Sequence, residues 1–149
     1  MLKILLPVDG SEASLDAVRH ALRLVADGLA ATFVLGNVQE PASVYELIRA
    51  HDPDVLQRVS EGAGAHLLEG AAALLDQAGV SWEREIASGE PAHVLGEMIE
   101  RHGIDAVVMG ARGLGAARSA IAGSVSHWLL VHAPVPVTVV RHVAPEDES

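Results

Sequence analysis

Two kinds of hydrophobic pattern alternate along the chain, and each predicts a different element. Short continuous apolar runs are typical of strands buried in a parallel sheet, whereas apolar positions three and four residues apart are typical of covering helices. The apolar runs cover residues 3–8, 31–38, 81–88, 105–110 and 136–141. The helical spacing falls between them, over residues 11–28, 42–80, 91–103 and 124–132.

This alternation predicts the fold class. A strand–helix order repeated to the end of the chain is typical of an α/β domain, here an open five-stranded parallel sheet with helices on both faces, which is a Rossmann-like arrangement. The run at 81–88 is the least hydrophobic of the five and is expected near a sheet edge. We expect one domain over residues 1–143 and an acidic, disordered tail over residues 144–149.

Local signals refine the helix ends. Ser11 offers an N-cap to the first helix, and Gly103 offers a C-terminal glycine to the helix that Pro91 opens. The helical stretch 42–80 is broken in its first part, where a short helix over 44–50 is expected. The glycines of EGAGAH (61–66) are expected to weaken the middle of this stretch. Residues 42–66 match no pattern that we can assign to a function.

Composition limits the classes of partner. The chain has 149 residues and a formal charge of −10, so its surface repels nucleic-acid backbones and anionic membranes, and we expect neither as a partner. It has no cysteine, which excludes thiol catalysis, disulfides and cysteine-bound metal. The apolar start is too short for a signal peptide, so we expect a cytoplasmic protein.

The candidate chemistry lies at two strand ends. The first strand ends at Asp9-Gly10-Ser11, and the fourth runs into the glycine-rich stretch GARGLGAARSAIAGS at 110–124. Ligands of open parallel sheets bind at the carboxyl ends of the strands, so these two turns share one crevice if their strands are neighbours. Asp9 suits a hydroxyl, a metal or a turn cap, and Arg112 suits a phosphate or solvent.

The glycine-rich stretch has two interpretations of equal weight. Glycines let the backbone approach an anion, and the helix that opens after Gly123 offers free N–H groups to a phosphate. Alternatively, small residues merely pack tightly between sheet and helix. A lysine-containing P-loop is excluded because Lys3 is the only lysine, and GARGLG does not complete the dinucleotide motif GxGxxG. No metal-binding histidine pair or hydrolase serine motif is present in the sequence.

Several blocks in order resemble the universal stress protein family. They are KILLPVDGS at the start, GEPAHVL, DAVVMGARG, and GSVSHWLLVHAPVPVTVVR near the end. The spacing Gly110-x2-Gly113-x9-Gly123-Ser124 resembles the G-x2-G-x9-G-[ST] motif of the ATP-binding branch. Gly115 lies outside that spacing and is interpreted as ordinary loop. Asn37 stands where the family often has histidine.

The resemblance implies an adenine nucleotide alpha hydrolase-like fold and a site for ATP, ADP or AMP. The adenine and ribose would lie among one group of residues, Pro7, Asp9, Val38 and Met109, with main-chain bonds from Val38 to the base. The phosphates would lie against Gly110, Arg112, Gly113, Gly123, Ser124 and Val125, with Mg²⁺ or Mn²⁺ held by the phosphates rather than by the protein. A homodimer through the last strand is implied, over Val137, Thr138, Val139 and Val140.

Three functions follow from these expectations. The first is a nucleotide-binding stress-response module that acts as a regulatory dimer. The second is a stress-related interaction protein that works without nucleotide, as in the branch that lacks the glycine motif. The third is a slow ATPase, which lacks support because Asp9, the obvious base, is expected beside the ribose rather than the terminal phosphate.

Overall fold

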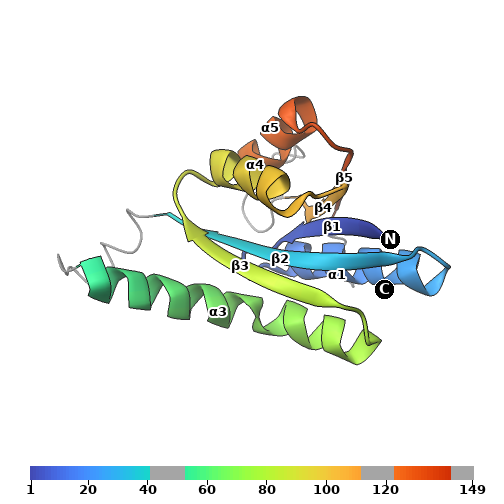
Figure 1. The fold of residues 1–149 in the computed structure, drawn as a ribbon, viewed down its shortest axis with the longest axis horizontal. Coiled ribbons are helices and arrows are strands. Elements are labelled where there is room, and N and C mark those ends of the chain that lie inside the picture. Colours follow the sequence, from blue (N-terminus) through green and yellow to red (C-terminus); the bar gives the residue numbers. More distant parts are fainter. Residues whose placement is uncertain (41–52, 112–122, 142–149) are drawn as a thin grey trace, which may run out of the picture.

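The computed structural model describes residues 1–40, 53–111 and 123–141, with only the backbone for residues 53–57, 59 and 60. Strands and helices alternate in it as the hydrophobic pattern predicts (Figure 1). The elements are β1 (Leu2–Pro7), α1 (Glu12–Ala26), β2 (Ala31–Gln39), α3 (Pro53–Ala78), β3 (Trp82–Ser88), α4 (Pro91–His102), β4 (Ala106–Gly110), α5 (Ser124–His132) and β5 (Val137–Val140). Two predictions, the short helix over 44–50 and the tail over 144–149, lie outside the described residues.

The five strands form one parallel sheet in the order β3-β2-β1-β4-β5, which confirms the predicted fold class. From β1 the chain moves outward through β2 to β3, and it then returns to the other side of β1 for β4 and β5. β1 and β4 are therefore neighbours, with Leu5 paired to Val107. The direction of winding reverses between these two strands, which is where open sheets bind ligands.

Each sheet face has its own core because side chains alternate along the buried strands. Leu6 of β1 packs with α1 and α3 on one face, and Leu5 packs with α4 and α5 on the other. Both leucines are completely buried. Aliphatic side chains dominate both cores, and Phe33 is the largest fully buried side chain. This two-sided burial explains why the strands are continuous apolar runs.

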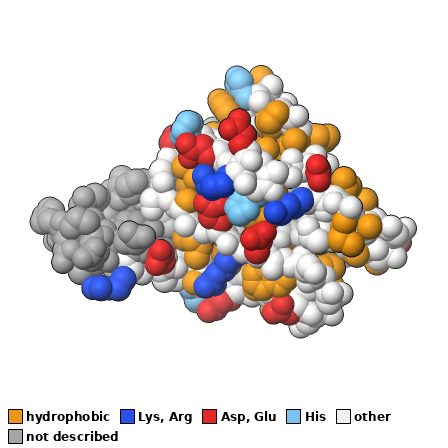
Figure 2. Space-filling model, viewed as in Figure 1, with side chains coloured by type: hydrophobic (Ala, Val, Ile, Leu, Met, Phe, Trp, Pro, Cys, Tyr) orange, Lys and Arg blue, Asp and Glu red, His pale blue; other side chains and the backbone are white. Residues whose placement is uncertain are grey.

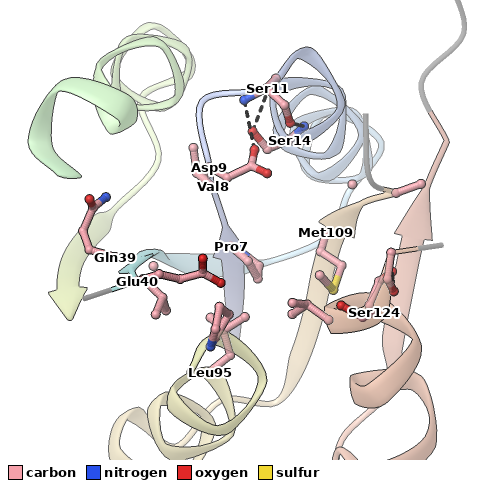
Figure 3. Close-up of a pocket in the computed structure, with 18 residues that line it drawn as sticks. Pro7, Val8, Asp9, Ser11, Ser14, Gln39, Glu40, Leu95, Met109 and Ser124 are labelled. Atoms are coloured by element: carbon pink, nitrogen blue, oxygen red, sulfur yellow. Dashed lines mark hydrogen bonds between the residues drawn. The ribbon is translucent and has the colours of Figure 1, made fainter. Parts of the chain in front are cut away.

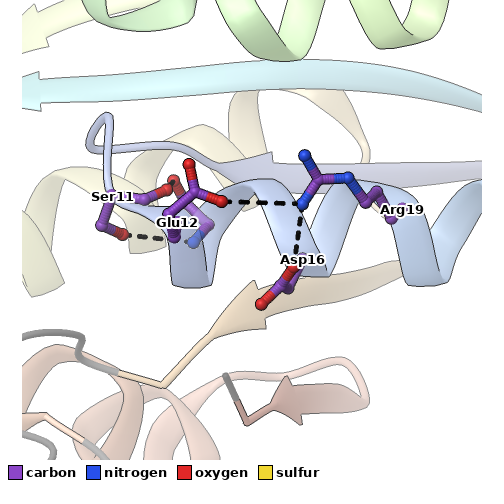
Figure 4. Close-up of polar contacts among 5 residues, drawn as sticks. Ser11, Glu12, Asp16 and Arg19 are labelled. Carbon is purple, nitrogen blue, oxygen red and sulfur yellow. Dashed lines mark hydrogen bonds and ion pairs between the residues drawn. The ribbon is translucent and has the colours of Figure 1, made fainter. Parts of the chain in front are cut away.

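The helix ends follow the signals in the sequence. Ser11 is the N-cap of α1, and its hydroxyl accepts a hydrogen bond from the Ser14 amide at 3.2 Å. Figure 4 shows this cap together with Arg19, which pairs with Asp16 at 2.9 Å and with Glu12 at 3.9 Å. Gly103 ends α4 with φ at 64°, a left-handed conformation that glycine adopts without strain.

The glycines of α3 do not interrupt the helix, which runs through them for 26 residues. Gly64 lies over β2 and β3, and a Cβ there would be 2.5 Å from Ile86 Cγ2 and 2.9 Å from Asn37 Oδ1. A Cβ at Gly62 would meet nothing within 4 Å. Gly64 therefore has a packing role, because the absence of a side chain there allows α3 to approach the sheet closely.

The outer strand β3 lies at a sheet edge, as its weak hydrophobicity predicts. Its Glu85 carboxylate accepts a hydrogen bond from Arg101 and one at 2.6 Å from His102 Nε2, both at the end of α4. Burial raises the pKa of Glu85, but these hydrogen bonds and the two positive partners outweigh it and hold the pKa below its usual value. Figure 2 shows charged side chains gathered over the middle of the face of the molecule that it displays.

Each helix in residues 1–40, 53–111 and 123–141 is too short or too polar to cross a membrane. The uncharged stretch from Ser119 to Val140 contains α5 and β5, which belong to the α/β sheet fold.

Candidate functional site

A pocket of about 420 Å³ opens at the carboxyl ends of β1, β2 and β4, at the position where the winding reverses (Figure 3). Its volume is in the range of small-molecule sites. Three helices begin around it, since residues at the starts of α1, α4 and α5 line its wall. The lining residues are Pro7, Val8, Asp9, Ser11, Ser14, Gly36, Val38, Gln39, Glu40, Pro91, Leu95, Met109, Gly110, Ala111, Gly123, Ser124, Val125 and Ser126.

Eight of the ten residues predicted for a site line this one pocket. They are Pro7, Asp9, Val38, Met109, Gly110, Gly123, Ser124 and Val125. The other two, Arg112 and Gly113, lie outside the described residues. These residues come together because β1 and β4 are neighbours in the sheet, which was the condition for the two strand-end turns to share one crevice. Their roles toward a ligand stay predictions.

The first two helix starts at the pocket each have a side-chain acceptor of their own. At α1, the Asp9 carboxylate accepts from the Ser11 amide at 2.9 Å, and the Ser11 hydroxyl caps the first turn. At α4, the Glu90 carboxylate accepts from the amides of His93 at 2.8 Å and Ala92 at 3.3 Å. These N–H groups are therefore already used and do not need a ligand.

The start of α5 is different. Gly123 is its N-cap and has no side chain, and no side chain of the described residues caps the helix. The Ser126 hydroxyl donates to the Gly123 carbonyl at 2.9 Å and so does not cap the amides. Ser124 is the first residue inside the helix, and its hydroxyl has no partner among the described residues. The amides of Ser124, Val125 and Ser126 likewise have no acceptor there, and all three residues line the pocket.

Gly110 serves packing as well as lining the pocket. A Cβ at this position would lie 2.3 Å from the Ala13 carbonyl oxygen and 2.9 Å from the Ser14 amide nitrogen. The first turn of α1 therefore crosses directly over the end of β4. Of the two interpretations of the glycine-rich stretch, tight packing applies to Gly110, whereas the unused amides at α5 favour an anion.

The charge of the pocket is uneven. Asp9 and Glu40 are the charged residues among the described lining, and both are acidic. In Figure 3 the Glu40 carboxylate points toward Pro7, on the side of the pocket away from Ser124. No group of three potential metal ligands occurs in the part of the chain that the structure describes. The described lining therefore offers a metal ion only the two carboxylates of Asp9 and Glu40.

Sequence reasoning missed the residues of the pocket that come from α4 and from the end of β2. Pro91 and Leu95 line it from α4, and Gln39 and Glu40 line it beyond Val38. An apolar helix face is visible in the sequence, but nothing in the local pattern indicates which strand ends that face reaches.

Comparison with known proteins agrees with the fold. The model of the universal stress protein family matches residues 1–141. The chain belongs to this family. Universal stress protein YxiE of Bacillus subtilis (strain 168) is 28% identical over 145 residues, which cover 93% of this chain and 98% of the relative.

Two solved structures of the family are similar and carry nucleotides. A universal stress protein family protein from Arabidopsis thaliana with AMP bound is 26% identical with a TM-score of 0.71, covering 99% of this chain and 97% of that one. A universal stress protein in complex with cAMP is 25% identical with a TM-score of 0.69, covering 96% and 98%. Family membership therefore agrees with the five-stranded parallel sheet.

Proposed function

We propose that this universal stress protein binds an adenine nucleotide, with ATP as the principal candidate, in the pocket between the ends of β1 and β4. The observation that carries the proposal is the start of α5, which has no side-chain cap among the described residues and whose first three residues line the pocket with their N–H groups unused there. Such a helix start attracts anions through its amides and its dipole. The starts of α1 and α4 already have carboxylate or hydroxyl acceptors, so α5 is the favoured phosphate position among the three.

The rest of the pocket lining suits a nucleoside. Pro7, Val38 and Met109 supply apolar surface for a flat base, and the Asp9 carboxylate accepts hydrogen bonds from hydroxyl groups such as those of ribose. Two similar family structures contain AMP or cAMP, which supports the adenine part of the proposal. The motif spacing Gly110-x2-Gly113-x9-Gly123-Ser124 supports the phosphate part.

A divalent ion fits only as part of the ligand. The described residues hold no cluster of metal ligands, and Asp9 and Glu40 make the pocket acidic. Mg²⁺ or Mn²⁺ coordinated by the phosphates would reduce repulsion between these carboxylates and the nucleotide. We propose a regulatory role rather than catalysis, because the Asp9 carboxylate already accepts a hydrogen bond from the Ser11 amide and is assigned in this proposal to the ribose.

Calorimetric titration with Mg·ATP tests the proposal through two changes at one residue. Ser124→Ala removes the hydroxyl, whereas Ser124→Pro also removes one amide, and proline is compatible with the first helical position. We expect roughly tenfold weaker binding for each hydrogen bond to phosphate that is lost, so the proline variant should bind more weakly than the alanine variant. Equal affinity of all three proteins would refute the phosphate position. Absence of binding by the wild type would favour the nucleotide-independent interaction protein.

The free edge of β5 supports the proposal that the protein is a homodimer. β5 has no charged residue and lies at the sheet edge, whereas the opposite edge strand carries Glu83, Arg84 and Glu85. An exposed apolar edge strand pairs readily with another chain, whereas charged side chains on the opposite edge strand disfavour such pairing. Next to β5, α5 exposes Trp128, Leu130 and Val131. Trp128 is 38% exposed and stacks on His132 with ring centroids 4.4 Å apart.

Light scattering after size exclusion tests the dimer. Thr138 is an exposed residue of β5, and Thr138→Lys would place a charge on the edge. We expect this variant to shift the protein toward monomer, while Gln77→Lys on the exposed end of α3 leaves the molar mass unchanged. A wild-type monomer, or an unchanged dimer in the Thr138 variant, would refute pairing through β5.

A further inference from the structure

Asn37 of β2 is a buried polar residue, with 2% of its surface exposed, and it lies next to Val38 of the pocket. Its side chain lies on the sheet face covered by α3, where Gly64 passes close to its Oδ1 atom. Val38 packs against the core on the opposite face. A polar amide in such a position persists when its hydrogen bonds are satisfied and specific.

Both ends of the Asn37 amide have a partner. Nδ2 donates to the Val8 carbonyl at 2.8 Å, and Oδ1 accepts from Gln39 Nε2 at 2.7 Å. The orientation is determined by chemistry, because the Val8 carbonyl can only accept and so must face the nitrogen. The amide therefore connects residues 29 positions apart in the sequence.

These two bonds join the parts of β1 and β2 that form the pocket wall. The Val8 amide donates to the Gly36 carbonyl at 2.8 Å, so Asn37 adds a second link between the strands just before Asp9. Asp9 and Val38, the residues that follow Val8 and Asn37, both line the pocket. A change in the Val8–Asn37 bond would thus move the two sides of the proposed nucleoside site relative to each other.

We propose that Asn37 is a positioning residue of the nucleotide site, which sets the separation of Asp9 and Val38 through its bond to Val8. This inference rests on the proposed function, since it assigns a role in nucleotide affinity to a residue that the ligand does not touch. It predicts that the hydrogen-bond donor facing Val8 controls affinity even when the fold is intact.

Asn37→Asp tests the donor without changing the shape of the side chain. The protonated acid can donate to Val8, but the carboxylate would place a second acceptor against the carbonyl oxygen. Burial beside that oxygen favours the protonated acid. We expect affinity for Mg·ATP near that of the wild type at acidic pH, and roughly ten- to a hundredfold weaker at alkaline pH. Dividing the affinity of the variant by that of the wild type at each pH cancels the effect of the protonation of ATP itself.

Among the described residues of the surrounding elements, the following titratable groups have other partners or are exposed to solvent. Glu85 of β3 points to the other sheet face, where it contacts Arg101 and His102 of α4. Glu61 and His66 of α3 are exposed to solvent, and the Asp9 carboxylate accepts from the Ser11 amide. A change in affinity that is specific to the variant is therefore assigned to the new carboxyl group.

Two further variants complete the design. Gln77→Glu makes the same amide-to-carboxylate change at an exposed position near the end of α3, and we expect its affinity to equal that of the wild type at every pH. Asn37→Ala removes the donor without adding an acid, so its affinity should be reduced by a similar factor at all pH values. Circular dichroism at each pH shows whether the variants remain folded.

A second readout needs no ligand. Hydrogen exchange at the Val8 and Ser11 amides reports on the end of β1, and their protection in Asn37→Asp should fall as the pH rises, relative to the wild type. If the protein binds ATP while affinity and protection in this variant follow the wild type, the inference is overturned. If the wild type does not bind ATP but protection falls as expected, the link between strands is supported and the nucleotide proposal fails.

Discussion

Two glycines in the same helix should respond in opposite directions to substitution by alanine. Gly62 and Gly64 both lie inside α3, so each gains the same preference for helix when a Cβ is added. At Gly62 the Cβ meets nothing within 4 Å, but at Gly64 it would lie 2.5 Å from Ile86 Cγ2 and 2.9 Å from Asn37 Oδ1. The methyl group of Ile86 cannot easily move, because a β-branched side chain is stiff at χ1.

The two contributions can be compared in magnitude. Replacing glycine by alanine inside a helix stabilises by about 0.5–1 kcal/mol, which should be the full effect of Gly62→Ala. Inserting a methyl group into a packed interface costs about 1–3 kcal/mol. Gly64→Ala should therefore destabilise the protein relative to Gly62→Ala by that amount. For a chain of this size the melting temperatures of the variants should differ by about 2–12 °C.

Urea unfolding followed by circular dichroism measures both free energies under one set of conditions. Both variants gain the same helix propensity, so the difference between their free energies of unfolding measures the contact of α3 with β2 and β3. If both alanines stabilise the protein equally, then α3 does not pack on the sheet at Gly64 as closely as the structure shows. An unchanged m-value in both variants is needed for this comparison, since a changed m-value indicates an altered denatured or native state.

Two further predictions concern the end of β4 and the outer strand. Gly110→Ala should destabilise the protein by about 1–3 kcal/mol or more in urea unfolding, because its Cβ would lie 2.3 Å from the Ala13 carbonyl oxygen; a neutral effect would contradict that contact. The lowered pKa of Glu85 means that its bonds to Arg101 and His102 stabilise the folded state above about pH 4.5, and this stabilisation is lost as pH falls through the folded-state pKa. Glu85→Gln should lower the free energy of unfolding at neutral pH, and this free energy should then decrease less steeply as the pH falls. An unchanged dependence on acidic pH would show that the Glu85 cluster contributes nothing.

Local patterns were sufficient for the elements. Helix α5 begins and ends where the sequence indicates, at Ser124 and His132, and Gly103 ends α4 as a left-handed glycine. These features depend on residues within a few positions of one another, because capping and amphipathic spacing act over one or two helical turns. The predicted parallel sheet follows from the same alternation of elements.

The site was predictable in part. Asp9 and the start of α5 were identified from turn residues and motif spacing, and they line the same pocket. The use of Gly110 was not predictable, because a glycine that admits a ligand and a glycine that admits a helix look alike in one sequence. Only the position of Ala13 over β4 distinguishes them.

The sequence by itself determined which segments become strands and helices, and it marked the strand ends that carry polar residues. The tertiary structure decided that β1 lies beside β4 and that Asn37 reaches Val8 across 29 positions. It also decided that the start of α5 has no side-chain cap among the described residues, whereas the other two helix starts at the pocket have one. The physical reason is that hydrophobic period and capping are local, whereas strand order and buried hydrogen bonds depend on contacts between segments far apart in the chain.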